Sequence, residues 1–307
     1  MSALKKQLGG YLPACGKLTV RDRLKLFREA GFHFVALSMP GIYVTAEAAV
    51  TPRLAEHFGL EIDNVHLTGT ATNQLWRDCL EAEDVLDRYC NEIELCAKMG
   101  IKIGITHVTW GSHAPTPEVS ALGVERFKRI AACAEKNNFC LALENSVTEE
   151  HLTAVLDAID SPNIGFCVDS GHWSCFTPDF DVMGRYGHRM VTMHLDDNDG
   201  IEDIHLLPYD GVVDWDRVVR DLSRTKPYEK RVLLEVDYCK RRAYPGYSAK
   251  ELQAMWEARG VKIASDLRLV DYHDGYLETY KNIGYDEYLD RMYRAAVRIA
   301  EGGEIKE

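Results

Sequence analysis

The hydrophobic residues of this chain follow two patterns that alternate along its length. Short apolar runs are separated by longer stretches in which apolar residues recur every three or four positions. The short runs predict buried β-strands, and the longer stretches predict amphipathic helices. The predicted strands lie at about 6–12, 32–39, 62–67, 101–109, 139–143, 163–168, 190–195 and 231–234. Strands that alternate with helices predict βαβ units and therefore a parallel sheet.

The clearest helical pattern lies at about 81–99, where Val85, Tyr89, Ile93 and Cys96 share one face. Further helices are predicted at about 20–30, 51–58 and 124–134, after Thr148 and after Asp214. Each predicted helix joins two predicted strands, as a parallel sheet requires.

The length of the chain, 307 residues, fits one closed barrel of eight βα units. We therefore predict an α/β fold, a (β/α)8 TIM barrel that occupies residues 1–307 as a single domain. An open doubly wound sheet is the alternative. That fold expects a glycine-rich phosphate loop, and neither GxGxxG nor GxxxxGK[ST] occurs in the sequence.

An extended C-terminal helical segment follows the eighth predicted strand. Ser248 and Glu251 form a capping-box pattern for one helix, and a last helix is predicted at about 285–300. The part at about 239–284 is rich in tyrosine and is predicted to be an insertion before the last helix. Three roles for it stay open: a lid over a site, a contact between the subunits of a homo-oligomer, and extra packing across the barrel wall.

Composition and charge narrow the class of partner. The net charge of −12 argues against a surface that follows a nucleic acid backbone. No apolar run is long enough for a membrane span or a signal peptide, so we expect a cytoplasmic protein with no membrane contact. The nine cysteines include no CxxC pair, and several lie inside apolar runs, so we expect reduced, buried thiols.

Imidazole and carboxylate side chains stand at the ends of the predicted strands or in the loops that follow them. They are His66, His107, Glu144, Asp169, His172, His194, Asp203, His205 and Glu235. In such a barrel the carboxyl ends of all strands face one mouth, so we expect these side chains to meet there. This mixture of donors suits a divalent cation.

A single histidine at a strand end is more often a hydrogen-bonded polar group than a metal ligand, and Asp169 alone could merely cap a helix. The joint arrangement favours a metal site. Glu144, Asp169 and Glu235 each close a separate apolar run, and His194 lies within a fourth. We predict that these four side chains form one metal cluster.

Four segments of the chain resemble the sugar phosphate isomerase/epimerase superfamily of xylose isomerase-like barrels. They read LALEN, CVDSGH, MHLDDNDGIEDIHLLPYDGVVDW and LLEVDY, and the likeness covers roughly residues 60–236. The resemblance implies that Glu144, Asp169, His194 and Glu235 hold one divalent metal ion, with Mn²⁺ favoured and Co²⁺, Mg²⁺ or Zn²⁺ open. It also implies that His172 binds substrate oxygens near the metal. Tyr209 departs from the superfamily pattern, because a glycine is common at its position.

The expected activity is that of a metal-dependent sugar isomerase or epimerase, acting on a sugar, a sugar phosphate or a keto-polyol. Glu144 and Glu235 are predicted to be the catalytic acid/base pair that removes and returns a proton through an enediolate. The expected partner is therefore a small carbohydrate. The residues expected to contact it are His172, His66, His107, Asp203, His205 and Trp110.

Three alternatives stay open. The nine strand-end residues also resemble, in type and order, the ligands of the three zinc ions of endonuclease IV, which would make the chain a phosphodiesterase. Acidic residues in the loop at 196–210 argue against it, because DNA binding requires basic loops. A metal-dependent lyase acting on a sugar or C-glycoside is the second alternative, and a non-catalytic binding module is the third.

Overall fold

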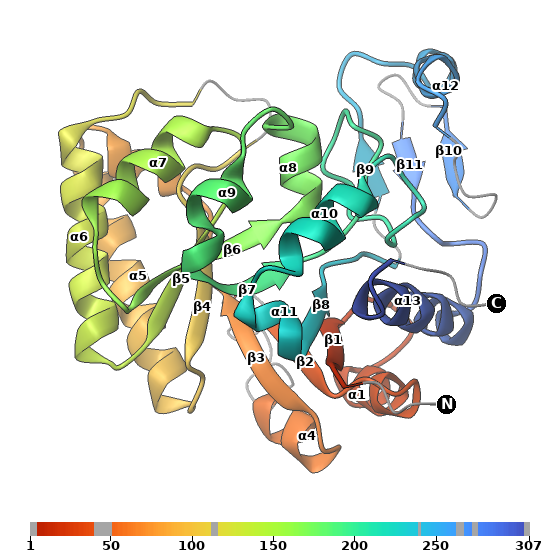
Figure 1. Ribbon diagram of the computed structural model, residues 1–307, viewed down its shortest axis with the longest axis horizontal. Coiled ribbons are helices and arrows are strands. Elements are labelled where there is room, and N and C mark those ends of the chain that lie inside the picture. Colours follow the sequence, from red (N-terminus) through yellow and green to blue (C-terminus); the bar gives the residue numbers. More distant parts are fainter. Residues whose placement is uncertain are drawn as a thin grey trace.

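Eight parallel strands form the centre of the molecule in the computed structural model (Figure 1). The structure describes residues 5–39, 51–111, 116–238, 241–261, 267–271 and 276–303. The strands are β1 (Gln7–Tyr11), β2 (Phe34–Ser38), β3 (Glu61–His66), β4 (Ile103–His107), β5 (Cys140–Glu144), β6 (Ile164–Asp169), β7 (Met190–His194) and β8 (Arg231–Leu234). They are ordered β7-β6-β5-β4-β3-β2-β1-β8. From β1 to β7, each strand therefore pairs with the next one in sequence, and β8 pairs with β1.

The sheet closes between β7 and β8. Leu195 and Leu234 form a parallel bridge, in which the Leu195 amide donates to the Leu233 carbonyl at 3.1 Å. The Glu235 amide donates in turn to the Leu195 carbonyl at 3.0 Å. This closure confirms the predicted TIM barrel and excludes the open doubly wound sheet.

Helices cover the outside of the barrel (Figure 1). They include α1 (Val20–Glu29), α4 (Thr51–His57), α5 (Glu81–Lys98), α6 (Ala121–Lys136), α7 (Glu149–Ala158), α10 (Trp215–Leu222), α11 (Lys226–Lys230) and α13 (Tyr285–Ala300). The face predicted for α5 is buried, from Val85 to Cys96. The short helices α8 (Ser170–Phe176) and α9 (Val182–Tyr186) and the 3-10 turns η1 (Thr72–Trp76) and η2 (Gly187–Arg189) were not predicted.

A disulfide joins α5 to α6 on the outside of the barrel. Cys90 and Cys133 form it, with their Cα atoms 5.6 Å apart. The expectation that the cysteines are reduced is therefore wrong for this pair. It holds for six others among the described residues, of which Cys96 and Cys167 are buried.

The C-terminal tail adds a second, smaller sheet. Its three antiparallel strands are β9 (Arg241–Ala243), β10 (Arg268–Val270) and β11 (Tyr276–Glu278), with β11 in the centre. Helix α12 (Ala249–Ala258) begins at the predicted capping box, and the predicted last helix is α13. In Figure 1 this sheet and α12 stand beside the barrel, near the loop that follows β7.

Aromatic side chains of the tail form hydrogen bonds with the loop that follows β7. The Tyr280 hydroxyl donates to Asp210 at 2.6 Å and accepts from the Leu207 amide at 2.9 Å. The indole of Trp256 donates to Asp199 at 2.9 Å. Tyr244 and Tyr280 are fully buried, so these two side chains pack as part of the core. Tyr272 lies outside the described residues, and the roles of lid and subunit contact stay predictions.

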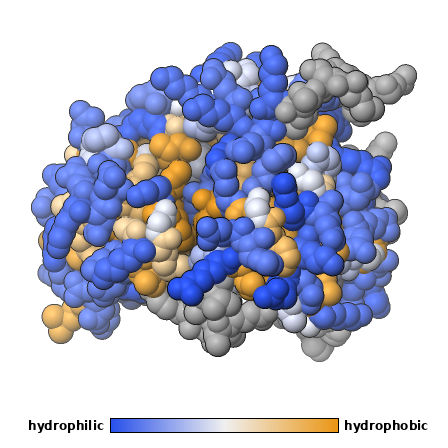
Figure 2. All heavy atoms as spheres, turned by 90° about the horizontal axis from the view of Figure 1, so that it is seen from below, coloured by the Kyte–Doolittle hydropathy of each residue, from blue (hydrophilic) through white to orange (hydrophobic). Residues whose placement is uncertain are grey.

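The surface seen in Figure 2 is mostly hydrophilic, with smaller hydrophobic areas between the polar side chains. Within the part of the chain that the structure describes, no helix has the length and hydrophobicity that crossing a membrane requires.

Candidate metal centre and cavity

A cavity of about 850 Å³ opens at the carboxyl ends of the strands. Its lining includes seven of the ten residues predicted to form the site, namely His66, His107, Trp110, His172, Asp203, His205 and Glu235. The remaining three, Glu144, Asp169 and His194, are fully buried. The barrel therefore brings all of the predicted site residues to one mouth, although they come from segments up to 169 positions apart (66 to 235).

The four side chains predicted to bind metal come together beneath this cavity. We call Glu144, Asp169, His194 and Glu235 the floor. Their potential ligand atoms all lie within 4.8 Å of one another. The Nδ1 atom of His194 lies 2.7 Å from Glu144 Oε1 and 2.6 Å from Glu235 Oε2. Neighbouring strands produce this arrangement, because Asp169 at the end of β6 is in register with His194 at the end of β7.

The floor contains polar atoms that the protein leaves unsatisfied. Oδ1 of Asp169 accepts from the His172 amide at 2.6 Å and so caps α8, but Oδ2 is buried with no hydrogen-bond partner. Nε2 of His194 is buried in the same state. A buried polar atom without a partner costs free energy, so these two atoms call for a ligand. Carboxylate oxygens and an imidazole nitrogen are a donor set that fits a divalent cation.

The pKa shifts of the floor carboxylates also favour a bound cation. Burial raises the pKa of Glu144, but the charges of His194 and His107 outweigh burial and hold that pKa well below its usual value. Burial likewise opposes ionisation of Glu235, yet His194 lowers the pKa of Glu235 to about 2. Burial, with the negative charge of Glu144, raises the pKa of Asp169 well above its usual value. Burial and the neighbouring carboxylates therefore disfavour ionisation of Asp169, and a bound cation would favour it.

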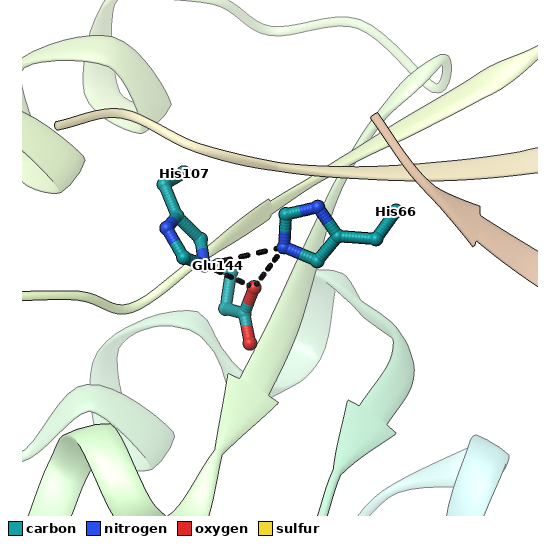
Figure 3. A group of neighbouring side chains, drawn as sticks. All are labelled: His66, His107 and Glu144. Atoms are coloured by element: carbon teal, nitrogen blue, oxygen red, sulfur yellow. Dashed lines mark hydrogen bonds and ion pairs between the residues drawn. The ribbon is translucent and has the colours of Figure 1, made fainter. Parts of the chain in front are cut away.

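A second group of ligand-type side chains adjoins the floor and shares Glu144. Figure 3 shows His66, His107 and Glu144 pointing toward one another. Nε2 of His107 lies 2.9 Å from Glu144 Oε2, and Nε2 of His66 lies 3.4 Å from the same oxygen. Trp110 stacks on the ring of His107 at 5.3 Å and is 44% exposed, so it offers an aromatic face at the mouth.

A row of charged and polar side chains forms one side of the cavity. We call His172, Asp203, His205, Asp237 and Arg242 the wall. Along it, the charged side chains pair at His172–Asp203 (3.4 Å), Asp203–His205 (2.9 Å), His205–Asp237 (3.7 Å) and Asp237–Arg242 (2.6 Å). The wall therefore runs from the edge of the floor to strand β9 of the tail.

The loop after β7 corrects one sequence-based argument. Its acidic residues were expected to make the mouth repel DNA, but Asp196, Asp197 and Asp199 are buried. The carboxylate of Asp197 accepts from the amides of Tyr209 and Val213 and from the indole of Trp215, each within 2.9 Å. These aspartates therefore build the loop, while Glu202 and Asp203 line the cavity.

Tyr209 keeps a backbone conformation that favours glycine. Its φ is +74°, in the left-handed region, and its ring packs against Trp215 at 5.2 Å. His205 has a positive φ as well, +51°. The loop therefore holds two non-glycine residues in a strained conformation, a state that is common beside functional sites.

Four residues of the site were missed in the sequence. Tyr11 at the end of β1 lines the cavity, and its buried hydroxyl has no hydrogen-bond partner. Asp196 has a ligand atom within 4.8 Å of those of Asp203 and His205. Asp237 could have been found, because it lies two positions after Glu235 on the same chain segment. Arg242 belongs to a basic run at 240–242, which the sequence predicts to be a solvated face or a phosphate contact, and only the fold of the tail brings it to the barrel.

These features define a closed α/β barrel whose mouth carries a buried group of metal-type donors. Residues 24–259 match the family described as the xylose isomerase-like TIM barrel. The chain belongs to this family. The uncharacterized protein y4fM of Sinorhizobium fredii (strain NBRC 101917 / NGR234) is 27% identical over 267 residues, covering 72% of this chain and 86% of that protein.

Two solved structures illustrate the likeness of fold. D-psicose 3-epimerase with D-tagatose, from Clostridium cellulolyticum H10, matches with a TM-score of 0.66 at 13% identity, over 96% of this chain and 98% of that one. The IOLI protein with a bound zinc atom matches with a TM-score of 0.66 at 14% identity, over the same shares of the two chains. At these identities the similarity establishes the fold.

Proposed function

We propose that the protein is a divalent-metal-dependent sugar isomerase or epimerase. The floor carries this proposal, because its four side chains are gathered beneath a cavity of about 850 Å³, large enough for a small molecule, and include buried atoms without partners. Two of the solved structures with this fold support it, one described as a D-psicose 3-epimerase and one as binding zinc. Mn²⁺ is the ion we favour.

Glu144, Asp169, His194 and Glu235 would hold the metal ion. When bound, the ion would stabilise negative charge that develops on substrate oxygens as a proton leaves the adjacent carbon. The two glutamates are assigned to proton transfer. Glu235 lines the cavity and Glu144 lies beneath it, and the carboxylates of both approach Nδ1 of His194.

The assignment places an ionised carboxylate at the cavity. His194 lowers the pKa of Glu235 to about 2, so this side chain carries a negative charge at neutral pH. His172 would orient substrate oxygens, since its Nδ1 is held 2.9 Å from the Asn145 carbonyl while its Nε2 lies 3.4 Å from Asp203 Oδ2.

A phosphodiesterase is the second candidate, and one observation favours it. His66, His107 and Glu144 form a second group of ligand-type atoms within 4.8 Å, which shares Glu144 with the floor, and Asp196, Asp203 and His205 form a third. A site with three ions would suit phosphodiester hydrolysis, whereas the floor alone would bind one.

Solvent deuterium incorporation tests the proposal. Ketoses, keto-polyols and their phosphate esters are incubated in D2O with the protein and Mn²⁺, and exchange at the carbon next to the carbonyl is followed by NMR. Exchange with at least one sugar, with one metal ion per chain, supports the isomerase or epimerase. Three zinc ions per chain, cleavage of DNA at abasic sites and no exchange would overturn it in favour of the phosphodiesterase.

A further inference from the structure

The wall differs from the floor in the kind of ligand that would satisfy its unpaired atoms. Oδ1 of Asp203 is buried with no hydrogen-bond partner and can only accept. Nε of Arg242 is buried with no partner and can only donate. A hydroxyl group both donates and accepts, so separate hydroxyl groups of one substrate suit both atoms. A phosphate dianion only accepts, and it would face the wall carboxylates with no proton between the oxygens.

The balance of charge around the cavity also favours hydroxyl groups over a phosphate group. Arg242 is the one lysine or arginine among the described residues that line it, whereas Glu202, Asp203, Glu235 and Asp237 also line it. The guanidinium of Arg242 lies 2.6 Å from the Asp237 carboxylate, so its charge is already balanced. Phosphate sites in proteins present unbalanced cations or several backbone amides.

The positions of Asp237 and Arg242 explain how these side chains reach a substrate. Asp237 follows β8, two residues beyond the floor residue Glu235, and its amide donates to the His205 carbonyl at 3.0 Å. Arg242 comes from β9, so the small tail sheet supplies the outer end of the wall. A substrate whose reacting carbons lie at the floor would extend its remaining hydroxyl groups along the wall.

We infer that the wall selects an uncharged polyhydroxy substrate over its phosphate ester, and that Asp237 and Arg242 are the residues that determine this specificity. The inference rests on the proposed function for the direction in which the substrate lies. Asp237 lowers the affinity for a phosphate group in two ways, since it repels the anion and balances the charge of Arg242.

Binding of two probes that cannot react tests the inference. A six-carbon alditol and its terminal phosphate monoester lack a carbonyl, so calorimetry with the Mn²⁺-supplemented full chain measures binding without turnover. We expect the free alditol to bind at least about tenfold more tightly than the phosphate. In Asp237→Asn the charge of Arg242 is no longer balanced, and this preference is expected to fall by about tenfold or more.

Two further variants separate specificity from folding. Arg242→Met is expected to weaken alditol binding about tenfold, and Arg242→Lys to restore part of it, with unchanged melting temperatures. Asp157→Asn is the matched control, because Asp157 pairs with Arg185 at 2.5 Å far from the cavity lining. It should leave both affinities as they are.

The outcomes are decisive in either direction. Tighter binding of the phosphate by the unaltered protein, an unchanged preference in Asp237→Asn, or no binding of either probe overturns the inference. Preferential binding of the alditol without proton exchange on any sugar would refute the proposed function and leave the inference standing. Proton exchange with phosphorylated sugars alone would support the proposed function and refute the inference.

Discussion

The floor and the wall of the cavity use the same residue types in different surroundings. In the floor, Glu144, Asp169 and His194 are fully buried and lie in a group tight enough to share one ion. In the wall, Asp203 and His205 keep 21% and 16% of their side-chain surface exposed and form a row of pairs. Donors converge on one point in the floor and are spread along a line in the wall.

This difference indicates that burial and convergence decide what a carboxylate can do. A buried carboxylate without a cation is expensive to ionise, as the raised pKa of Asp169 indicates. Asp203 in the wall is balanced by His172 and His205, and its Oδ1 atom is left for a ligand. The floor is therefore suited to a metal ion and the wall to hydroxyl groups.

Removing a floor carboxylate should have the largest effect. Glu144→Gln and Glu235→Gln keep the shape of each side chain but remove its ability to take a proton. We expect each to lower the rate of proton exchange with solvent by about 10³-fold. The measurement is NMR-detected deuterium incorporation with the best substrate of the panel, at saturating Mn²⁺.

A wall variant is the natural comparison for these two. Asp203→Asn should mainly raise KM, because it removes a substrate contact and leaves the floor unchanged. Full exchange activity in both glutamate variants would contradict the assignment of the acid/base pair. A loss in Asp203→Asn as large as theirs would erase the distinction between floor and wall.

The floor was more predictable from the sequence than the wall, for a physical reason. Each floor residue closes a short apolar run or, as His194 does, lies within one. The barrel brings all strand ends to one mouth, so local pattern and fold class suffice. The end of the wall at Arg242 depends on a three-residue strand of the tail. So short a strand has no alternation of apolar and polar positions to reveal it.

The same limit applies to secondary structure. The last helix, Tyr285–Ala300, was predicted with its full extent, because sixteen residues hold several turns of apolar periodicity. The helix Val182–Tyr186 was missed, because five residues complete little more than one turn. The aspartates after β7 were used in the sequence only as an argument against DNA binding, since nothing local indicates that backbone amides converge on Asp197.

The gain in stability on binding metal should depend on the floor and not on the wall. A ligand at about 100 times its Kd stabilises the folded state by about 2.7 kcal/mol. Saturating Mn²⁺ should therefore raise the melting temperature of the chelator-treated protein by several degrees, and Asp169→Asn should lose most of this gain. Differential scanning calorimetry with and without Mn²⁺ measures it.

Asp203→Asn serves as the control, and it should keep the gain. If Asp169→Asn kept the gain and Asp203→Asn lost it, the ion would bind the wall and the comparison would be reversed.

The loop that carries the wall should depend on Gly211. A Cβ atom there would lie 2.1 Å from the Asn198 carbonyl oxygen and 2.4 Å from a carboxylate oxygen of Asp197. Because the backbone oxygen cannot move away easily, we expect Gly211→Ala to destabilise the protein by about 2 kcal/mol and to weaken substrate binding. Gly16→Ala is the control, with no atom within 4 Å of its Cβ. Equal stabilities of the two variants in denaturant unfolding would refute this role of the loop.

The smallest expected effect is a pH dependence within the wall, measured without metal. Burial lowers the pKa of His205, but Asp203 outweighs burial and the net pKa is raised. Burial raises the pKa of Asp203, yet His205 and His172 hold it well below its usual value. Stability from His205 is therefore fully present below its unfolded pKa of about 6.5 and is lost as pH rises through the raised value. Stability from Asp203 is present above about pH 3.9 and is lost as pH falls through its lowered pKa.

The pair should therefore stabilise the fold most between about pH 4 and 6.5. His205→Asn tests this, because asparagine tolerates the left-handed backbone of that position. We expect the free energy of unfolding to fall by about 1 kcal/mol more at about pH 5.5 than at about pH 9, a modest value because both side chains are partly exposed. Guanidinium unfolding in the presence of a chelator gives both numbers. A loss that is the same at both pH values would mean that His205 acts in the wall through packing and neutral hydrogen bonds, and that the balance of charge assigned to the wall is wrong.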